Sequence, residues 1–251
     1  MTSHRFFVPV DAIEGGAATL PDAAASQVRR VLRLRPGDAV SVFDGSGAEW
    51  PATLTRVDRR AVTATLGERA WPAAEPSLRV SLLLGLTRPE RFELALEKCT
   101  ELGAHRFTPC ITDRVQGRDA SAPSAARLAR WRRIITEAAE QSGRVRVPVL
   151  DPPGGLAAAV HDAAQRGPVV MLWEEETAPL RDVLQQVLDG STPEDLALVI
   201  GPVGGLGREE VQAAVSQGAV TAGMGSRVLR AETAAIAGLT AVLYHARELG
   251  G

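Results

Sequence analysis

The sequence predicts a small β-barrel followed by an α/β domain built around a mostly parallel sheet. Two observations predict this fold class. About the first 70 residues contain short segments rich in β-branched and aromatic residues, separated by turn signals. From residue 78 onward, apolar strand-like runs alternate with helix-like stretches, which indicates parallel strands covered by helices on both faces. Prolines 72 and 76 suit a linker, so we expect a barrel domain at 1–72, a linker at 73–77 and the α/β domain at 78–251.

The predicted barrel contains four strands and one helical stretch. Glycine, proline and aspartate at 35–38, 44–47 and 58–60 favour tight turns, and these turns separate the strand-like segments. A helical stretch at about 23–31 interrupts the strands. The predicted strands are 5–8, 39–43, 50–57 and 61–66.

The second part alternates strands and helices in chain order. The continuous apolar run 80–84 is typical of a strand that is buried on both faces. Pro89 then stands where the first turn of a helix tolerates proline, and Gly103 suits the C-terminal cap of that helix. The other predicted elements are strands at 106–111, 169–173 and 196–200 and helices at 128–138, 179–188, 209–215 and 231–249.

Composition excludes several classes of protein. The chain has 251 residues, of which 45% are hydrophobic and 23% charged, as in an ordinary globular protein. No apolar run approaches the roughly 20 residues of a membrane helix, and the N-terminus lacks the apolar core of a signal peptide. The two cysteines, Cys99 and Cys110, and the four isolated histidines lack metal-ligand spacing. We therefore expect a cytoplasmic protein without a metal site or a membrane partner.

The charge is distributed unevenly along the chain. The net charge is −2, and 27 of the 28 basic residues are arginine, with Lys98 the exception. Residues 114–146 carry eight basic and three acidic side chains, whereas residues 151–251 carry six and thirteen. A nearly neutral chain can therefore still present a basic face to a phosphate backbone.

Two clusters of arginines are candidates for that face. Arg127, Arg130 and Arg133 repeat at helical spacing beside an apolar stripe, which is typical of a solvated helix face and also suits RNA. The same two interpretations apply to a cluster without acids near the N-terminus, made of Arg29, Arg30, Arg33 and Arg35.

Two glycine-containing segments are candidates for a ligand site. Residues 201–207 follow an apolar strand directly and precede a helix, and ligands in α/β sheets bind at the carboxyl ends of strands. The segment lacks the Lys-Ser/Thr of a P-loop and the G-x-G-x-x-G dinucleotide pattern, so an ordinary βα turn is the alternative. Residues 223–234 begin with glycines and enter a helix that carries Arg230 and Glu232. A solvated Arg–Glu pair at a helix start is the alternative there.

Together these motifs resemble the bacterial ribosomal RNA small-subunit methyltransferase E family, a SPOUT-class group that methylates N3 of a uridine in 16S ribosomal RNA. Each motif alone is weak, but their order and spacing are specific and run over nearly the whole chain. The segments that carry the resemblance are 5–8, 30–38, 97–103, 137–144, 200–205 and 229–234.

The resemblance implies a fold and a set of partners. The barrel would be a PUA-like RNA-binding domain, and the α/β domain would contain a trefoil knot, which general topology rules disfavour. The knot loops would hold S-adenosylmethionine, the substrate would be small-subunit ribosomal RNA, and the active unit would be a homodimer.

The resemblance also implies roles for individual residues. Arg230 and Glu232 would flank the transferred methyl group, and Arg144 would assist the uracil. Glu232 would act either as the base or as a residue that orients Arg230. The implied cofactor contacts are Leu172, Trp173, Glu174, Gly201, Pro202, Gly204, Gly205, Met224, Gly225, Ser226, Val228 and Leu229. The implied RNA contacts are Arg29, Arg30, Arg33, Arg88, Arg114 and Gln141.

The chain departs from the family pattern at three positions. Val203 replaces a glutamate, so no carboxylate role is expected there. Arg88 takes the place of a lysine before a helix, and Gln27 takes the place of a histidine before the first basic cluster.

The alternatives to a uridine-N3 methyltransferase are a SPOUT enzyme that methylates the ribose 2′-oxygen, a non-catalytic RNA-binding protein, and a nucleotide-binding α/β protein.

Overall fold

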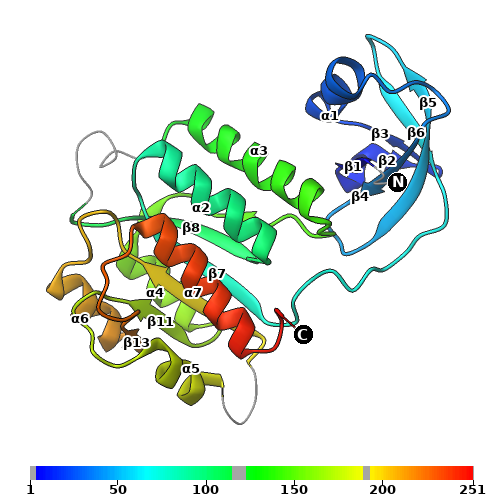
Figure 1. Cartoon of the computed structure of the whole chain (residues 1–251). Coiled ribbons are helices and arrows are strands. Elements are labelled where there is room, and N and C mark those ends of the chain that lie inside the picture. The colour runs from blue at the N-terminus through cyan, green and yellow to red at the C-terminus, as the bar shows by residue number, and fades with distance from the viewer. Residues whose placement is uncertain (1–3, 115–122, 189–192, 251) are drawn as a thin grey trace. The chain divides into compact units, whose positions relative to one another are not determined.

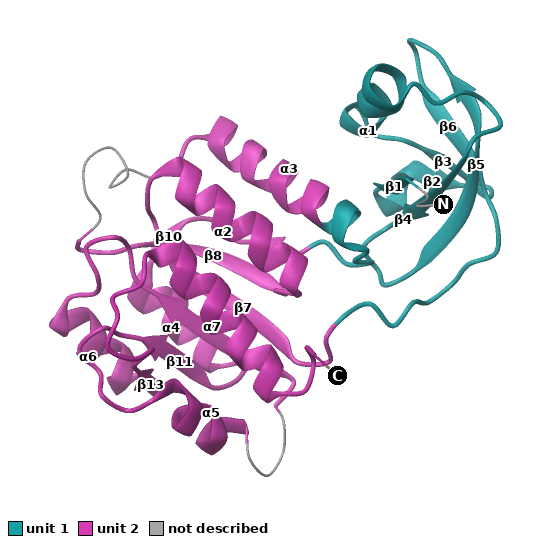
Figure 2. Cartoon of the chain, viewed as in Figure 1, with its two compact units in different colours: residues 1–75, 139–147 teal, residues 76–138, 148–251 magenta. Residues whose placement is uncertain are grey.

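The computed structural model describes residues 4–114, 123–188 and 193–250, drawn in colour in Figure 1. The chain forms two compact units, which Figure 2 distinguishes. Unit 1 consists of residues 1–75 and 139–147, and unit 2 consists of residues 76–138 and 148–251. Unit 1 is therefore discontinuous in sequence, because nine residues from the middle of the chain belong to it.

Unit 1 is built on a six-stranded sheet with strand order β1-β4-β5-β6-β3-β2. All neighbours are antiparallel except β1 and β4, which are parallel. The strands are β1 (His4–Phe7), β2 (Ile13–Glu14), β3 (Ala17–Thr19), β4 (Ala39–Phe43), β5 (Glu49–Val57) and β6 (Val62–Leu66). The helical segments are η1 (Val10–Ala12), α1 (Asp22–Ser26) and η2 (Gln27–Leu32).

Side chains that alternate along the strands form the core of this unit. In β5, Ala52 and Leu54 are buried while Thr53 and Thr55 between and after them are exposed, as expected for a sheet with one dry face. Val28 of η2 is fully buried in the same core, so the helical segment closes the apolar side of the sheet.

In the described part of unit 2, seven strands form a sheet in which neighbouring strands are parallel. The order is β10-β8-β7-β12-β11-β13, and β9 pairs with β8. The strands are β7 (Arg79–Gly85), β8 (Arg106–Ile111), β9 (Val149–Leu150), β10 (Gly154–Gly155), β11 (Val169–Leu172), β12 (Asp195–Ile200) and β13 (Ala219–Ala222). The helices are α2 (Pro89–Leu102), α3 (Ala125–Ser142), α4 (Leu156–Ala164), α5 (Leu180–Leu188), α6 (Arg208–Ser216) and α7 (Ala231–His245).

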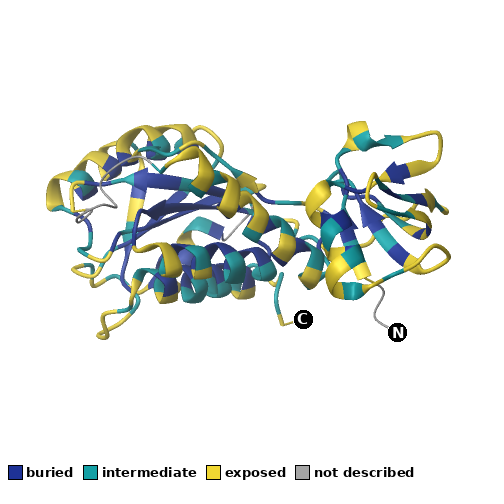
Figure 3. Ribbon diagram, turned by 90° about the horizontal axis from the view of Figure 1, so that it is seen from above, coloured by how far each residue is buried: buried dark blue, intermediate teal, exposed yellow. Residues whose placement is uncertain are grey.

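Helices cover both faces of this sheet, and the strands in the middle of the molecule are buried (Figure 3). Leu83, Met171 and Val199 pack with α4 and α6 on one face. On the other face α7 lies close to the strands, because a Cβ added at Gly238 would come within 2.9 Å of Leu172 and Leu198. The prediction of parallel strands covered by helices is thus confirmed.

The register of the sheet brings four strand ends to one level. Leu172 of β11 pairs with Ile200 of β12 and with Ala222 of β13, and Ile200 pairs with Leu84 of β7. The loops that leave these strands therefore start side by side at the carboxyl edge of the sheet, where α/β proteins bind ligands.

The structure adds elements that the sequence pattern did not predict. They are β2, β3, β9, β10, α4 and β13. The predicted terminal helix ends at His245 rather than at residue 249, since the chain turns there and Arg247 adopts a left-handed φ of 60°. In the described part of the chain, no helix has both the length and the apolarity required to cross a membrane.

Candidate functional site

A pocket lies in unit 2 at the carboxyl ends of β11, β12 and β13. It encloses about 800 Å³ of empty space, counting its open mouth, which is within the usual range for small-molecule sites. The loop after each of the three strands contributes to the walls, together with the first turn of α7. The lining residues are Leu172, Trp173, Glu174, Ile200, Gly201, Pro202, Val203, Gly205, Met224, Gly225, Ser226, Arg227, Val228, Leu229, Ala231 and Ala234.

Glycine at position 205 shapes one wall of the pocket. Its φ is +70°, a left-handed conformation that side chains disfavour, and its N–H donates to the Pro202 carbonyl at 3.0 Å to close a turn. A Cβ at this position would also overlap the Glu174 carboxylate. The loops after β11 and β12 can approach each other this closely because residue 205 has no side chain.

Contacts outside the pocket hold the 201–207 loop in place. Arg114 Nη1 donates to the Gly204 carbonyl at 3.3 Å. Glu210, in the first turn of α6, accepts hydrogen bonds from the backbone N–H groups of Gly207 at 2.9 Å and Asp113 at 3.0 Å. The loop is therefore tied to the helix that follows it and to the segment that follows β8.

A second carboxylate orders the loop after β11. Glu176 accepts hydrogen bonds from the Thr221 hydroxyl on β13 and from the backbone N–H groups of Ala178 and Thr177. These three donors favour the ionised carboxylate and lower the pKa of Glu176, with Thr221 as the largest cause. Gly223 N–H in turn donates to the Ala178 carbonyl at 2.8 Å, so this loop and the loop after β13 share one network.

The pocket brings together most residues that the resemblance implied for the cofactor. Eleven of those twelve residues line it. Gly204 does not line it but packs against Arg114, whose carbonyl oxygen would lie 3.0 Å from an added Cβ. The other five lining residues were not named as cofactor contacts, although Val203, Arg227, Ala231 and Ala234 lie within the candidate segments 201–207 and 223–234. Ile200 lies outside both segments, and its place at the end of an apolar strand, directly before the first segment, is the signal that could have indicated it.

Arg230 and Glu232 lie at the start of α7, next to the pocket. Arg230 is the N-cap residue and is exposed to solvent. Glu232 is buried in the first helical turn, where the helix dipole favours a negative charge, and its Oε1 lies 3.8 Å from Nε of Arg91. Leu229 and Ala231 line the pocket, so the exposed cation of Arg230 and the buried carboxylate of Glu232 belong to the segment that borders it.

Arg144 has a different environment from the one that the resemblance implied. It belongs to unit 1, is buried, and forms an ion pair with Glu75 at 2.6 Å. Glu75 also accepts hydrogen bonds from the backbone N–H groups of Val145 and Arg146. Within this chain the Arg144 guanidinium is thus engaged in holding the 139–147 segment to unit 1, and its catalytic role stays a prediction.

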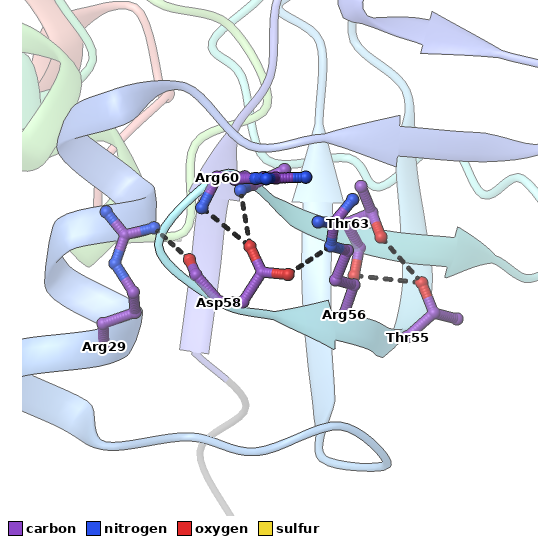
Figure 4. A network of polar contacts seen from close by, with 7 residues as sticks. Arg29, Thr55, Arg56, Asp58, Arg60 and Thr63 are labelled. Atoms are coloured by element: carbon purple, nitrogen blue, oxygen red, sulfur yellow. Dashed lines mark hydrogen bonds and ion pairs between the residues drawn. The ribbon is translucent and has the colours of Figure 1, made fainter.

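The arginines implied for RNA lie in both units. Arg29 donates to the Asp58 carbonyl at 2.9 Å beside the β5–β6 turn, where Asp58 also accepts hydrogen bonds from that turn's backbone and from Arg56 (Figure 4). Arg30 of η2 and Arg33, the residue that caps the end of η2, are both exposed. In unit 2, Arg88 and Arg114 are exposed, whereas Gln141 is exposed in the part of α3 that belongs to unit 1.

The basic stripe of α3 is largely paired. Arg130 forms two hydrogen bonds with Glu93 at 2.6 and 2.7 Å, and Arg133 lies 3.7 Å from Glu137. Arg127 lies over the Trp131 ring, with its Cζ 5.1 Å from the ring centroid. The solvated-helix interpretation therefore describes much of this stripe.

The cysteines do not provide a nucleophile. Burial raises the pKa of Cys110 to about 12 and also raises the pKa of Cys99, so both thiols are protonated at neutral pH. Among the residues that the structure describes, no group of three or more metal-ligating side chains is found.

Family models match both parts of the chain. A model described as an RNA methyltransferase domain matches residues 74–243, and one described as an RNA methyltransferase PUA domain matches residues 28–67. The fold class implied by the resemblance, a SPOUT-type α/β domain preceded by a PUA-like domain, is confirmed.

Relatives agree over nearly the full length. The chain is 36% identical to ribosomal RNA small subunit methyltransferase E of Synechocystis, covering 96% of this chain and 78% of that protein. The Bacillus subtilis protein of the same name is 30% identical, with 88% and 87% covered.

Solved structures with the same fold contain a bound cofactor. Methyltransferase E from Neisseria gonorrhoeae, bound to S-adenosyl methionine, has a TM-score of 0.86 and 29% identity over 97% of this chain and 98% of that one. A putative methyltransferase from Legionella pneumophila in complex with SAM has a TM-score of 0.87 and 30% identity, with the same coverage. The chain therefore belongs to the ribosomal RNA small subunit methyltransferase E family of RNA methyltransferases.

Proposed function

We propose that this protein uses S-adenosylmethionine to methylate N3 of a specific uridine in 16S ribosomal RNA. The observation that carries the proposal is the pocket at the ends of β11, β12 and β13, with Arg230 and Glu232 at its edge. The Neisseria gonorrhoeae relative with this fold is bound to S-adenosyl methionine, which supports the choice of cofactor.

The lining of the pocket fits an adenosyl compound. Gly201, Gly205 and Gly225 leave backbone groups accessible, and backbone N–H and C=O groups can hydrogen-bond an adenine edge. Leu172, Ile200 and Leu229 supply apolar surface for the ring. The exposed Glu174 carboxylate offers an acceptor for ribose hydroxyls or the ammonium group.

The reaction requires an electrophile and a deprotonated uracil nitrogen. When bound, S-adenosylmethionine supplies a methyl group that is already electrophilic because its sulfur is a sulfonium. Uracil N3 is flanked by two carbonyls, so removal of its proton places negative charge on O2 and O4. The exposed Arg230 guanidinium stabilises that charge electrostatically, and Glu232 provides the carboxylate that accepts the proton.

Substrate binding would involve both units. The exposed arginines Arg30 and Arg33 of unit 1 and Arg88 and Arg114 of unit 2 would contact phosphates, which position RNA without reading its sequence.

We also propose a homodimer that works in the cytoplasm. An open apolar groove lined by residues of α5 and α7, including the exposed Tyr244, supports a self-association surface.

Analysis of the modified nucleoside tests the reaction. After incubation of unmodified 16S RNA or small subunits with the protein and the cofactor, digestion and mass spectrometry should detect N3-methyluridine. A methyl group on the ribose would support the 2′-O-methyltransferase alternative instead. Absence of any methylation together with retained RNA binding would support the non-catalytic alternative.

The variant Arg230→Ala tests the role of the exposed arginine. Loss of one donor to a developing anion typically lowers kcat by about 10²–10³-fold. Calorimetry should show cofactor affinity close to wild type, because Arg230 does not line the pocket. Arg208→Ala, at an exposed residue of α6 paired with Glu175, is the control and should leave turnover unchanged. Near-normal turnover of Arg230→Ala would remove Arg230 from the mechanism.

A further inference from the structure

A small recess lies next to the proposed cofactor pocket, on the side of β7 and α2. Ile200, Gly201 and Ala231 line both the recess and the pocket, so they form the partition between them. The partition between the recess and the pocket is thin, because the backbone of Gly85, the last residue of β7, lies directly against the backbone of Pro202. A Cβ added at Gly85 would lie only 2.5 Å from the Pro202 nitrogen. A group inside the recess is therefore separated from the pocket by only one layer of backbone.

Two residues that line this recess each carry a buried polar atom without a hydrogen-bond partner. Thr87 and Glu232 both line it, and the residues are only 6% and 8% exposed. Among the described residues, neither the Thr87 hydroxyl Oγ1 nor the carboxylate oxygen Oε2 of Glu232 has a hydrogen-bond partner. A buried polar group without a partner destabilises the folded state, and more so when it is charged, so a polar ligand at this place would be favoured.

The size of the recess indicates which polar ligand it accepts. Its interior volume of about 10 Å³ matches a single water site, and the walls offer a hydroxyl and a carboxylate, which are suitable partners for a buried water. Ordered waters of this kind are stable when at least two polar groups hold them.

The surrounding contacts hold both groups in position. Arg127 Nη2 donates to the Thr87 carbonyl at 3.3 Å, and the N–H of Leu86 donates to the Cys110 carbonyl at 2.9 Å, so the backbone at Thr87 is fixed. Arg91 Nε lies 3.8 Å from Oε1 of Glu232, whereas Oε2 is the carboxylate oxygen without a hydrogen-bond partner.

We propose that Thr87 and Arg91 are positioning residues for Glu232, and that one water held between Thr87 and Glu232 fixes the carboxylate that accepts the uracil N3 proton. The inference rests on the proposed function. The N3 proton passes to the Glu232 carboxylate, which becomes neutral, while the water keeps its place and its protons. Arg91 stabilises the ionised carboxylate before the transfer, and the Thr87 hydroxyl orients the water.

The variant Thr87→Val tests the hydroxyl, because valine has nearly the shape of threonine. We expect kcat to fall about 10-fold or more, as positioned proton transfer contributes at least this much, with cofactor affinity and thermal midpoint near wild type. Thr87→Ser should restore most of the activity. Thr100→Val, the same change at another buried threonine of unit 2, is the control and should keep wild-type kcat. Wild-type kcat in Thr87→Val would overturn the inference.

A double-mutant cycle separates positioning from a structural role. If the Thr87 hydroxyl acts only through the Glu232 carboxylate, Thr87→Val should not lower kcat any further in a Glu232→Gln background. An equal loss of kcat from Thr87→Val in the wild-type and Glu232→Gln backgrounds would contradict the positioning role of Thr87.

A readout independent of turnover is a crystal structure at high resolution without RNA. A water should lie within hydrogen-bond distance of both Thr87 Oγ1 and Glu232 Oε2, and should be displaced in Thr87→Val and kept in Thr87→Ser. An empty recess in the wild-type crystal would overturn the inference. Failure of the proposed function would instead show as a methyl group at another position, whatever the behaviour of Thr87.

Discussion

Two glycines let backbone segments approach closely, one in the wall of the pocket and one in the wall of the neighbouring recess. Gly205 and Gly85 are glycines for different physical reasons: the first adopts a left-handed conformation beside Glu174, and the second lies against the Pro202 backbone. The sequence indicated the first, because a glycine-rich loop after an apolar strand is a recognisable pattern. It could not indicate the second, since the contact depends on β7 lying next to β12, and sheet order is not a local property.

Comparison of Gly205→Ala with Gly218→Ala separates strain from obstruction. Both glycines have positive φ, at +70° and +93°, so both variants should lose about 1 kcal/mol of unfolding free energy through backbone strain. Only the methyl group at position 205 overlaps Glu174, whereas nothing lies within 4 Å at position 218. Calorimetry should therefore show weakened S-adenosylmethionine binding in Gly205→Ala alone. Equal affinities in both variants would mean that this wall does not contact the cofactor.

Polar and charged residues could likewise be predicted only where a local sequence pattern marks them. Arg230 and Glu232 could be singled out because they follow a glycine segment at a helix start. Thr87 and Arg91 could not, because their proximity to Glu232 arises only when α2 and α7 meet over the sheet. Arg144 was recognisable as a basic residue of a family motif, but its burial against Glu75, 69 residues away, carries no local signal.

At the scale of elements, long periodic segments were predictable and short ones were not. The β2–β3 hairpin has a Gly15-Gly16 turn with φ of 55° and 77°, a pattern that favours a tight hairpin, but its strands have only two and three residues. Both α4 and β13 are rich in alanine, which distinguishes poorly between a helix, a short strand and a loop when the flanks contain glycine. The missed β13 matters most, because one of the pocket loops leaves from it.

The variant Thr221→Val tests how the loop after β11 is attached to β13. The lowered pKa of Glu176 means that its contacts stabilise the fold above the ordinary value of 4.5 and lose that effect as the pH falls through the lower native value. Urea unfolding should therefore show that Thr221→Val has a lower free energy of unfolding than wild type at pH 7, and that this deficit shrinks toward pH 3. Thr240→Val, whose hydroxyl donates to the uncharged Ile236 carbonyl, is the control and should show a deficit independent of pH. A constant deficit for Thr221→Val would contradict the assignment.

At the scale of the whole molecule, the chain passes between the two units three times, after residues 75, 138 and 147. The predicted linker at 73–77 coincides with the first passage. The other two have no sequence signal, because the apolar pattern of α3 continues through residue 138 without a break. Glu140 accepts a hydrogen bond from Phe7 N–H at 2.9 Å, and Arg5 donates to the Arg144 carbonyl at 3.0 Å, so β1 holds the inserted segment.

The variant Glu75→Ala tests this attachment. Removal of one partner of a buried ion pair typically costs about 3–5 kcal/mol, because the other charge stays buried, and the Arg144 side chain is only 5% exposed. Amide hydrogen exchange should accelerate in β1 and β4 while β12 in unit 2 keeps its protection. Glu68→Ala, at an exposed residue of the same unit, is the control and should leave exchange unchanged. Wild-type protection of β1 in Glu75→Ala would show that the Glu75–Arg144 ion pair is not needed to hold the 139–147 segment to unit 1.

The discontinuity of unit 1 limits how evolution and protein engineers can exchange the N-terminal region, which contains the match to a PUA domain. A fragment cut after residue 75 would leave Arg5 and the Phe7 amide without Arg144 and Glu140, which they contact in the intact chain. Grafting the N-terminal region of a relative onto this catalytic domain should thus succeed only if the nine residues after position 138 are transplanted with it. The two separated pieces of unit 1, residues 1–75 and 139–147, must therefore be inherited as a matched set.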